Sequence, residues 1–280
     1  MAQGNLQGNS FTPGCPWVEI EGTFNCRDFG GYQCGPNLST RTRDRMLYRS
    51  GHLEGLTLSG LQKMRELSIS TIIDLRNLGE AKALYSKDKP DNENLNGFKI
   101  IRFPLDQKGL SIQHCSAKYE KYLKIGSTAV AQEYFDMLLE GHQTIRDILL
   151  LLRDNPSDVF LIHCSLGKDR TGIIFAILFS LAGVAHEAIA SEYSLSEAAL
   201  ESLLPDIAQV VKASAPPGLT STEALRIARG VITTTKDAMM LTLEKLEETF
   251  GSTFRYVSEC CGLCLEDINQ IQQNLTLESK

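Results

Sequence analysis

The stretch His163-Cys164-Ser165-Leu166-Gly167-Lys168-Asp169-Arg170-Thr171-Gly172 decides the fold, because it lies between two apolar segments of different length. The short run at 159–162 holds only β-branched, aromatic and aliphatic residues, which predicts a buried strand. The longer run at 173–184 predicts a buried helix whose first turn begins near Arg170 or Thr171. We therefore expect the stretch to be a loop between the carboxyl end of a strand and the N-terminus of a helix.

A loop in this position is suited to binding an anion. The first backbone N–H groups of a helix have no partners within the helix, and the helix dipole favours negative charge beside them. Gly167 can adopt backbone angles that other residues avoid, which lets the N–H groups of Ser165, Leu166 and Gly167 turn inward together. We expect this loop to bind a phosphate, with His163 orienting the loop backbone.

Two side chains six positions apart would add chemistry to the anion site. A position beside a helix N-terminus favours the thiolate form of a cysteine, so Cys164 would be able to attack phosphorus. Arg170 can bind two phosphate oxygens at once, and the Thr171 hydroxyl can donate to the thiolate when it leaves. Taken alone, Cys164 could also be a small buried apolar residue. The preceding His163, the glycine in the loop, and the strand and helix around it favour the nucleophile.

Several stretches resemble one protein family, in the order that the family has them. The loop resembles the active-site loop of the cysteine-dependent protein tyrosine phosphatase superfamily. Its ending Gly-Lys-Asp-Arg-Thr-Gly is similar to that of an atypical branch, with mycobacterial, listerial and fungal members, that acts on tyrosine and lipid phosphates. The other matching stretches are Asn25-Cys26-Arg27-Asp28-Phe29-Gly30-Gly31-Tyr32, Leu47-Tyr48-Arg49-Ser50-Gly51-His52-Leu53, Ile72-Ile73-Asp74-Leu75-Arg76, and Thr249-Phe250-Gly251-Ser252 with Tyr256-Val257.

The resemblance runs from about residue 17 to residue 275 and implies an activity. It implies a hydrolase of phosphate monoesters that works through a phosphocysteine intermediate, on phosphotyrosine proteins, phosphoinositides or both. Two alternatives stay open: a phosphate-binding pseudophosphatase with weak catalysis, and a rhodanese-like sulfurtransferase. Cys26 departs from the family pattern, where a larger apolar residue is commoner, and this departure affects packing rather than chemistry.

Such a phosphatase needs a carboxyl group to protonate the leaving oxygen. Asp106 is the first candidate, because it follows Phe103-Pro104-Leu105 at the end of a predicted strand, and strand ends meet at the ligand crevice of such sheets. The Phe-Pro-x-Asp pattern also resembles the family's acid-bearing loop. Asp169 is the second candidate: its cationic neighbourhood favours the carboxylate, but the resemblance implies a catalytic part for it. Asp74 ends another strand and is expected to pair with Arg76 or Arg49.

Lys168 bears on the substrate. A lysine inside the loop would place a positive charge at its rim, which suits a second phosphate such as that of a phosphoinositide; the alternative is that Lys168 pairs with Asp169 or a surface acid. The net charge of −6 argues against nucleic acid as a partner and against general attraction to anionic membranes. Lys118, Lys121 and Lys124 recur every three residues and could make transient contact with an anionic membrane surface, or form an ordinary solvated face.

The chain reads as an α/β protein with a central, mostly parallel sheet flanked by helices. We expect a flexible leader at 1–16 and one phosphatase domain at 17–280. Further strands are predicted at 46–49, 71–75 and 98–105, a helix at 59–67, a helical insertion forming a lid at 107–156, and a helical C-terminal region. No apolar stretch reaches the roughly 18–20 residues of a membrane span, and no signal peptide is visible, so a cytoplasmic location is expected.

The cysteines predict neither a disulfide framework nor a metal site. The eight cysteines include Cys261 and Cys264 at CxxC spacing, with Cys260 adjacent, but no second pair stands at a spacing that would complete a zinc site. We therefore expect no metal and no cofactor. A second cysteine near Cys164 could protect it through a disulfide during oxidation, and the sequence leaves open which one.

Overall fold

The computed structural model describes residues 16–35, 38–84, 95, 97–106, 121–122, 124–214 and 218–278. The predicted leader, apart from residue 16, lies outside the described residues, as do residues 107–120 and 123 of the predicted insertion. Lys118 is among them.

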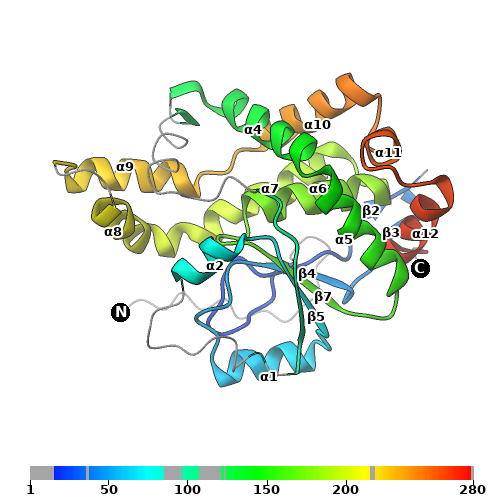
Figure 1. The fold of residues 1–280 in the computed structure, drawn as a ribbon, viewed down its shortest axis with the longest axis horizontal. Coiled ribbons are helices and arrows are strands. Elements are labelled where there is room, and N and C mark those ends of the chain that lie inside the picture. The colour runs from blue at the N-terminus through cyan, green and yellow to red at the C-terminus, as the bar shows by residue number, and fades with distance from the viewer. Residues whose placement is uncertain are drawn as a thin grey trace.

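The central sheet has the strand order β1-β4-β7-β5-β6 (Figure 1). Neighbouring strands are parallel throughout, except that β1 is antiparallel to β4. The predicted mostly parallel sheet is therefore confirmed. The strands predicted at 46–49 and 159–162 begin and end one residue later, the strand predicted at 71–75 ends one residue earlier, and the strand predicted at 98–105 covers only 99–102. Their bounds are β1 Arg27–Asp28, β4 Leu47–Ser50, β5 Thr71–Asp74, β6 Lys99–Arg102 and β7 Phe160–His163.

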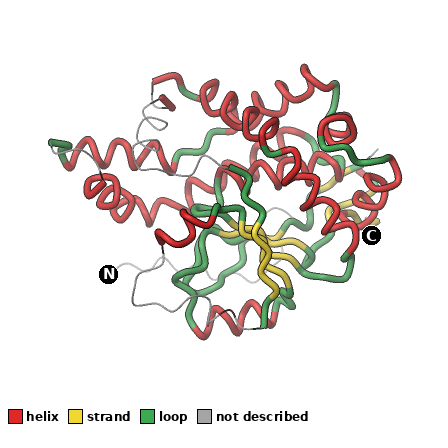
Figure 2. Tube along the Cα trace, viewed as in Figure 1, coloured by secondary structure: helices red, strands yellow, loops and turns green. Residues whose placement is uncertain are grey.

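Helices cover both faces of this sheet, and the central strands β5 and β7 are mostly apolar because both of their faces are buried. In β7, Phe160 and Ile162 point to a large core beneath α6 (Asp169–Ala182), while Leu161 between them packs in a second core. That second core includes Leu61 and Met64 of α1 (Leu58–Glu66), which corresponds to the predicted helix at 59–67. Figures 1 and 2 show α1 on one side of the sheet and α6 on the other.

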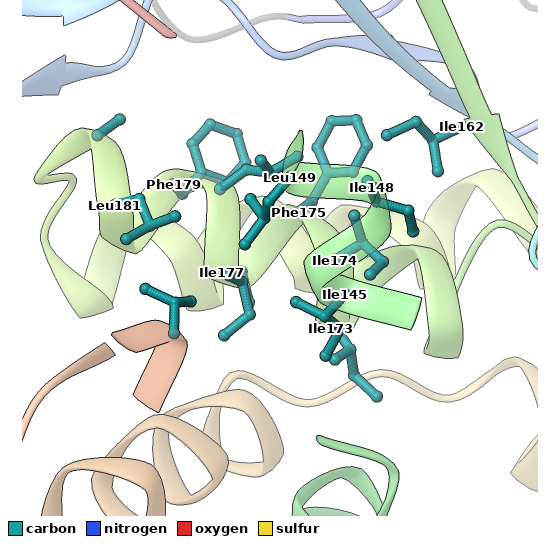
Figure 3. Packing of buried hydrophobic residues seen from close by; sticks show 14 of the residues in the cluster. Ile145, Ile148, Leu149, Ile162, Ile173, Ile174, Phe175, Ile177, Phe179 and Leu181 are labelled. Atoms are coloured by element: carbon teal, nitrogen blue, oxygen red, sulfur yellow. The ribbon is translucent and has the colours of Figure 1, made fainter. Parts of the chain in front are cut away.

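Helix α6 forms the centre of the larger core. It begins at Asp169, one residue before the predicted start, and ends at Ala182. The next residue, Gly183, caps the helix with a φ of +84°, a left-handed conformation that glycine accepts most easily. Ile174 and Ile177 lie next to Ile145, Ile148 and Leu149 of α5 (His142–Asp154), as Figure 3 shows. Burial on nearly every side explains why the α6 sequence is apolar all round rather than amphipathic.

The remaining helices lie mostly in the C-terminal half, as predicted. They are α2 Leu78–Leu84, α4 Ser127–Glu140, α7 His186–Leu200, α8 Leu204–Ser214, α9 Ser221–Ile232, α10 Lys236–Phe250, α11 Thr253–Arg255 and α12 Leu265–Leu275, with a 3-10 turn at Glu201–Leu203 and a π turn at Tyr256–Cys260. Helices α4 and α5 fill the later part of the predicted insertion. None of the helices in the described part of the chain is long and apolar enough to cross a membrane.

A second, antiparallel sheet was not predicted. It has the order β2-β3-β8 and joins Gln33–Cys34 and Thr40–Thr42 to Thr276–Glu278 near the C-terminus. This sheet connects residues 276–278 to residues 33–42. It lies beside the C-terminal end of α6, where the backbone N–H of Gly35 donates to the carbonyl of Gly183.

Candidate active site

The predicted phosphate loop has the expected setting. Cys164 follows directly on the last residue of β7, and α6 begins at Asp169, so the loop connects a buried strand to a helix N-terminus. Gly167 has a φ of +64°, and a Cβ there would lie 2.2 Å from the carbonyl oxygen of Ser50. The loop therefore passes too close to the end of β4 for any other residue at this position.

The loop carbonyls are held from behind by two side chains. The Asn25 amide donates to the carbonyl oxygens of Leu166 at 2.9 Å and Gly167 at 3.1 Å, and Arg49 Nη2 donates to the same Gly167 carbonyl at 2.7 Å. Because the N–H and C=O of a peptide unit point in opposite directions, these bonds fix which way the loop N–H groups face. Asn25 has a φ of 57°, a left-handed conformation that asparagine tolerates better than most residues.

Arg49 belongs to a buried ion cluster beneath the loop. Glu192 of α7 accepts from Arg27 Nε at 2.7 Å and from Arg49 Nη1 at 2.6 Å, and both arginine side chains are fully buried. The cluster holds two cations and one carboxylate, so its excess charge is positive. Burial lowers the pKa of Arg49 to about 10, although the negative charges of Glu192 and Cys164 oppose that shift. An anion at Cys164 would balance this excess charge.

Arg170 is held by a carboxylate that sequence reasoning did not single out. Its two terminal nitrogens donate to the two oxygens of Glu80, each at 2.6 Å, and the Ser165 hydroxyl donates to Glu80 Oε1 at 2.5 Å. Burial lowers the pKa of Arg170, but the hydrogen bonds and the charges of Glu80 and Cys164 outweigh burial and leave the pKa above its usual value. The two-pronged bond fixes the plane of the guanidinium at the loop.

Asp169 and Lys168 both contact helices beyond the loop. The Tyr134 hydroxyl donates to Asp169 Oδ1, and Lys168 Nζ lies 3.5 Å from the same oxygen. Lys168 is 1% exposed, and its ammonium donates to the carbonyl of Val231 at 2.6 Å, at the C-terminal end of α9. The predicted charge at the loop rim is thus placed inside, against the negative end of a helix. Of the two roles considered for Lys168, pairing with Asp169 agrees better with the structure than a charge at the loop rim.

His163 and Thr171 border the thiol. His163 Nδ1 lies 3.1 Å from the carbonyl oxygen of Cys164, and burial lowers the pKa of His163, so the ring is neutral at pH 7 and orients the backbone without adding charge. The Thr171 hydroxyl is buried and has no hydrogen-bond partner among the described residues.

The three carboxylates weighed as acids fall in different places. Asp74 pairs with Arg76 at 2.9 Å, as expected, and also with Arg102 at 3.3 Å, which was not predicted. Asp169 lies at the start of α6, within the loop itself. Asp106 is half-buried in the segment after β6, and its part in the site stays a prediction.

The comparison with protein families assigns the chain. A model described as "Tyrosine phosphatase family" matches residues 18–277, nearly the whole sequence. The chain belongs to the tyrosine phosphatase family. It is accordingly a phosphatase, and the family resemblance read from its motifs is confirmed.

Individual relatives of this tyrosine phosphatase are distant. It is 24% identical over 278 residues to the triple specificity protein phosphatase PtpB of Mycobacterium tuberculosis, covering 91% of this chain and 97% of that protein. Among solved structures, the core catalytic domain of the PP-IP phosphatase SIW14 from S. cerevisiae matches 79% of this chain and 91% of its own, at 14% identity and a TM-score of 0.33. TpbA of P. aeruginosa matches 71% and 96%, at 14% identity and a TM-score of 0.31.

Several residues around the loop of this phosphatase were not predicted from the sequence. They are mainly acids and tyrosines on neighbouring helices. Glu80 carried one weak signal, since it follows the Asp-Leu-Arg strand end by four residues and so lies near the crevice. Glu192, Tyr134 and Tyr193 lie in ordinary helical patterns with no motif around them. Only the folded arrangement brings these side chains to the loop.

Proposed function

We propose that this tyrosine phosphatase cleaves phosphate monoesters in two steps, with Cys164 as the nucleophile. In the first step the thiolate attacks phosphorus, the S–P bond forms, the P–O bond to the leaving group breaks, and a carboxyl group gives its proton to the leaving oxygen. In the second step water attacks the phosphocysteine, the carboxylate takes a proton from that water, and the S–P bond breaks to release phosphate and thiolate.

One observation carries the proposal: Cys164 lies at a helix N-terminus above a buried cluster with excess positive charge, beside an oriented Arg170. The helix N-terminus and the Arg27–Glu192–Arg49 cluster place positive charge close to the sulfur and to the phosphate that it would attack. Arg170 and the loop N–H groups would bind the non-bridging oxygens and follow their charge into the transition state. The Thr171 hydroxyl, which has no hydrogen-bond partner among the described residues, can donate to the sulfur when it leaves.

Asp169 supplies the proton in this proposal, and Asp106 is the alternative. Asp169 is the first residue of α6, next to Arg170, and its carboxylate accepts a hydrogen bond from Tyr134 of α4, which supports a defined position beside the phosphate loop. Asp106 is half-buried in the segment that follows β6.

We propose phosphotyrosine proteins and phosphoinositides as the substrate classes. The family description supports the first class, and the printed name of PtpB, a triple specificity phosphatase, supports an enzyme that accepts more than one kind of phosphate ester. Lys168 does not by itself argue for a second phosphate, because its ammonium is buried against α9.

The experiment is a substrate panel run on the wild-type chain and on Arg170→Lys. Turnover of phosphotyrosine peptides, phosphoserine peptides, and mono- and polyphosphorylated inositol lipids is measured by phosphate release. We expect wild-type turnover on phosphotyrosine peptides and inositol lipids. Arg170→Lys keeps the charge but loses the two-pronged geometry, and we expect its kcat/KM to fall about 10²- to 10³-fold on every substrate. A wild-type chain that releases phosphate only from phosphoserine peptides would contradict the substrate assignment.

A further inference from the structure

A chain of two buried tyrosines ends at Asp169. Tyr134 of α4 donates to Asp169 Oδ1, and the Tyr134 and Tyr193 hydroxyl oxygens lie 2.7 Å apart. Tyr193 belongs to α7, and both tyrosine side chains are almost fully buried. Three helices, α4, α6 and α7, therefore meet at one carboxylate of the phosphate loop.

The direction of the hydrogen bonds follows from the chemistry of the groups. An ionised carboxylate can only accept, so Tyr134 must donate to Asp169 and its oxygen is then free to accept from Tyr193. Burial raises the pKa of Tyr134 well above its usual value and also raises that of Tyr193, so both hydroxyls keep their protons at neutral pH. Tyr193 thus donates to Tyr134, and Tyr134 donates to Asp169.

We propose that Tyr134, supported by Tyr193, is a positioning residue that orients the Asp169 carboxylate and stabilises its ionised form. The inference rests on the proposed function, in which Asp169 exchanges a proton with the leaving oxygen and with water. It assigns to α4, a helix outside the loop, control over the pH range in which that exchange works.

Other groups around Asp169 act in the same direction. Lys168 Nζ at 3.5 Å and the Arg170 charge favour the carboxylate, as does the N-terminus of α6. Other titratable groups also face the two tyrosines. The Tyr122 hydroxyl lies near Tyr134, and the charged groups of Arg49 and Glu197 lie near Tyr193. Among the described residues, Tyr134 makes a direct hydrogen bond to the Asp169 carboxylate, and this bond contributes to its orientation.

The second glycine of the motif fits this arrangement. A Cβ at Gly172 would lie 3.0 Å from Cδ2 of Tyr193, so the absence of a side chain there lets the Tyr193 ring approach α6. The two tyrosine rings meet edge to face, with centroids 6.0 Å apart, which fixes the angle at which Tyr134 reaches Asp169.

The test compares four variants with the wild type. Tyr134→Phe removes the donor, Tyr193→Phe removes its support, and Asp169→Asn removes the titrating group. Tyr256→Phe is the matched control, because Tyr256 is equally buried and its hydroxyl donates to the backbone carbonyl of Leu138 at 2.6 Å rather than to the loop. The pH profiles of kcat and kcat/KM are measured on a phosphotyrosine peptide, a substrate with a poor leaving group.

We expect Asp169→Asn to remove one limb of the profile and Tyr134→Phe to move that same limb to higher pH. A hydrogen bond to a charged group corresponds to a shift of about one to two pH units. Tyr193→Phe should move the limb in the same direction by less, and Tyr256→Phe should leave it in place. At pH 7 the higher pKa of Asp169 leaves more of the acid protonated. Turnover of the peptide by Tyr134→Phe should therefore rise about 10-fold, with a smaller rise on p-nitrophenyl phosphate, whose leaving group needs less protonation.

A readout without turnover separates this inference from the proposed function. The carboxyl ¹³C chemical shift of Asp169 is followed as a function of pH in two proteins, the single variant Cys164→Ser and the double variant Tyr134→Phe with Cys164→Ser. A higher titration midpoint in Tyr134→Phe supports the inference even if the substrate assignment is wrong. An unchanged midpoint, or a limb that stays in place in Tyr134→Phe while Asp169→Asn removes it, overturns the inference and leaves the phosphatase intact. A limb that survives in Asp169→Asn overturns it in favour of another acid.

Discussion

Cys164→Ser is expected to lower turnover of p-nitrophenyl phosphate by about 10⁴-fold or more, the scale of losing the nucleophile of a covalent enzyme. A serine hydroxyl stays protonated beside the same helix N-terminus, and this site provides no described base that would activate it. The phosphate site itself, formed by Arg170 and the loop N–H groups, should remain. Inorganic phosphate should therefore still bind the variant, which thermal stabilisation by added phosphate will measure.

Cys261→Ser is the control for this loss. Cys261 is as buried as Cys164, but burial raises the pKa of its thiol to about 12, and it lies at the C-terminal π turn beside Tyr256. Turnover by Cys261→Ser should equal that of the wild type. Equal rates for Cys164→Ser and Cys261→Ser would show that the chemistry does not pass through Cys164.

Glu192→Gln is expected to lower the free energy of unfolding by about 3–5 kcal/mol, because it leaves Arg27 and Arg49 buried without a carboxylate. That is a large share of the stability of an ordinary domain. Urea denaturation measures the change. The matched control is Glu201→Gln, which breaks the exposed pair with Arg229 and should leave the midpoint almost unchanged. If Glu192→Gln unfolds at the same urea concentration as the wild type, the cluster does not stabilise the fold as we infer.

The same cluster predicts a dependence on acid. Burial raises the pKa of Glu192, but Arg27 and Arg49 lower it further, so the folded pKa lies below the ordinary 4.5. A lowered folded pKa means that the stabilisation is complete above 4.5 and is lost as the pH falls through the folded value. Between these two pH values, the wild type should lose stability more steeply than Glu192→Gln.

The features that could be predicted from the sequence are the local ones. The strand at 159–162, the loop and helix α6 follow one another without interruption, so their apolar pattern and the glycine at position 167 are readable in a single stretch. The second sheet was not readable, because its strands have only two or three residues and β8 pairs with β3 across most of the chain. Such pairing depends on tertiary contact rather than on pattern.

The surroundings of the loop are long-range for the same reason. Glu80 lies 90 positions from Arg170, and Glu192 lies 165 positions from Arg27, so no spacing in the sequence connects them. Lys168 shows the limit most clearly: the sequence places a cation in the loop, but the fold turns that cation toward α9, more than sixty positions further on. The charge of Lys168 is evident from the sequence, but the direction of its side chain could not be predicted.

The most direct test of the central claim is to trap the intermediate. The wild type is denatured rapidly in acid during turnover of p-nitrophenyl phosphate, digested, and examined by mass spectrometry for covalent phosphate. We expect phosphate on the peptide that contains Cys164, attached to its sulfur, and none in Cys164→Ser. Steady turnover with no covalent phosphate, or with phosphate on another residue, would contradict it.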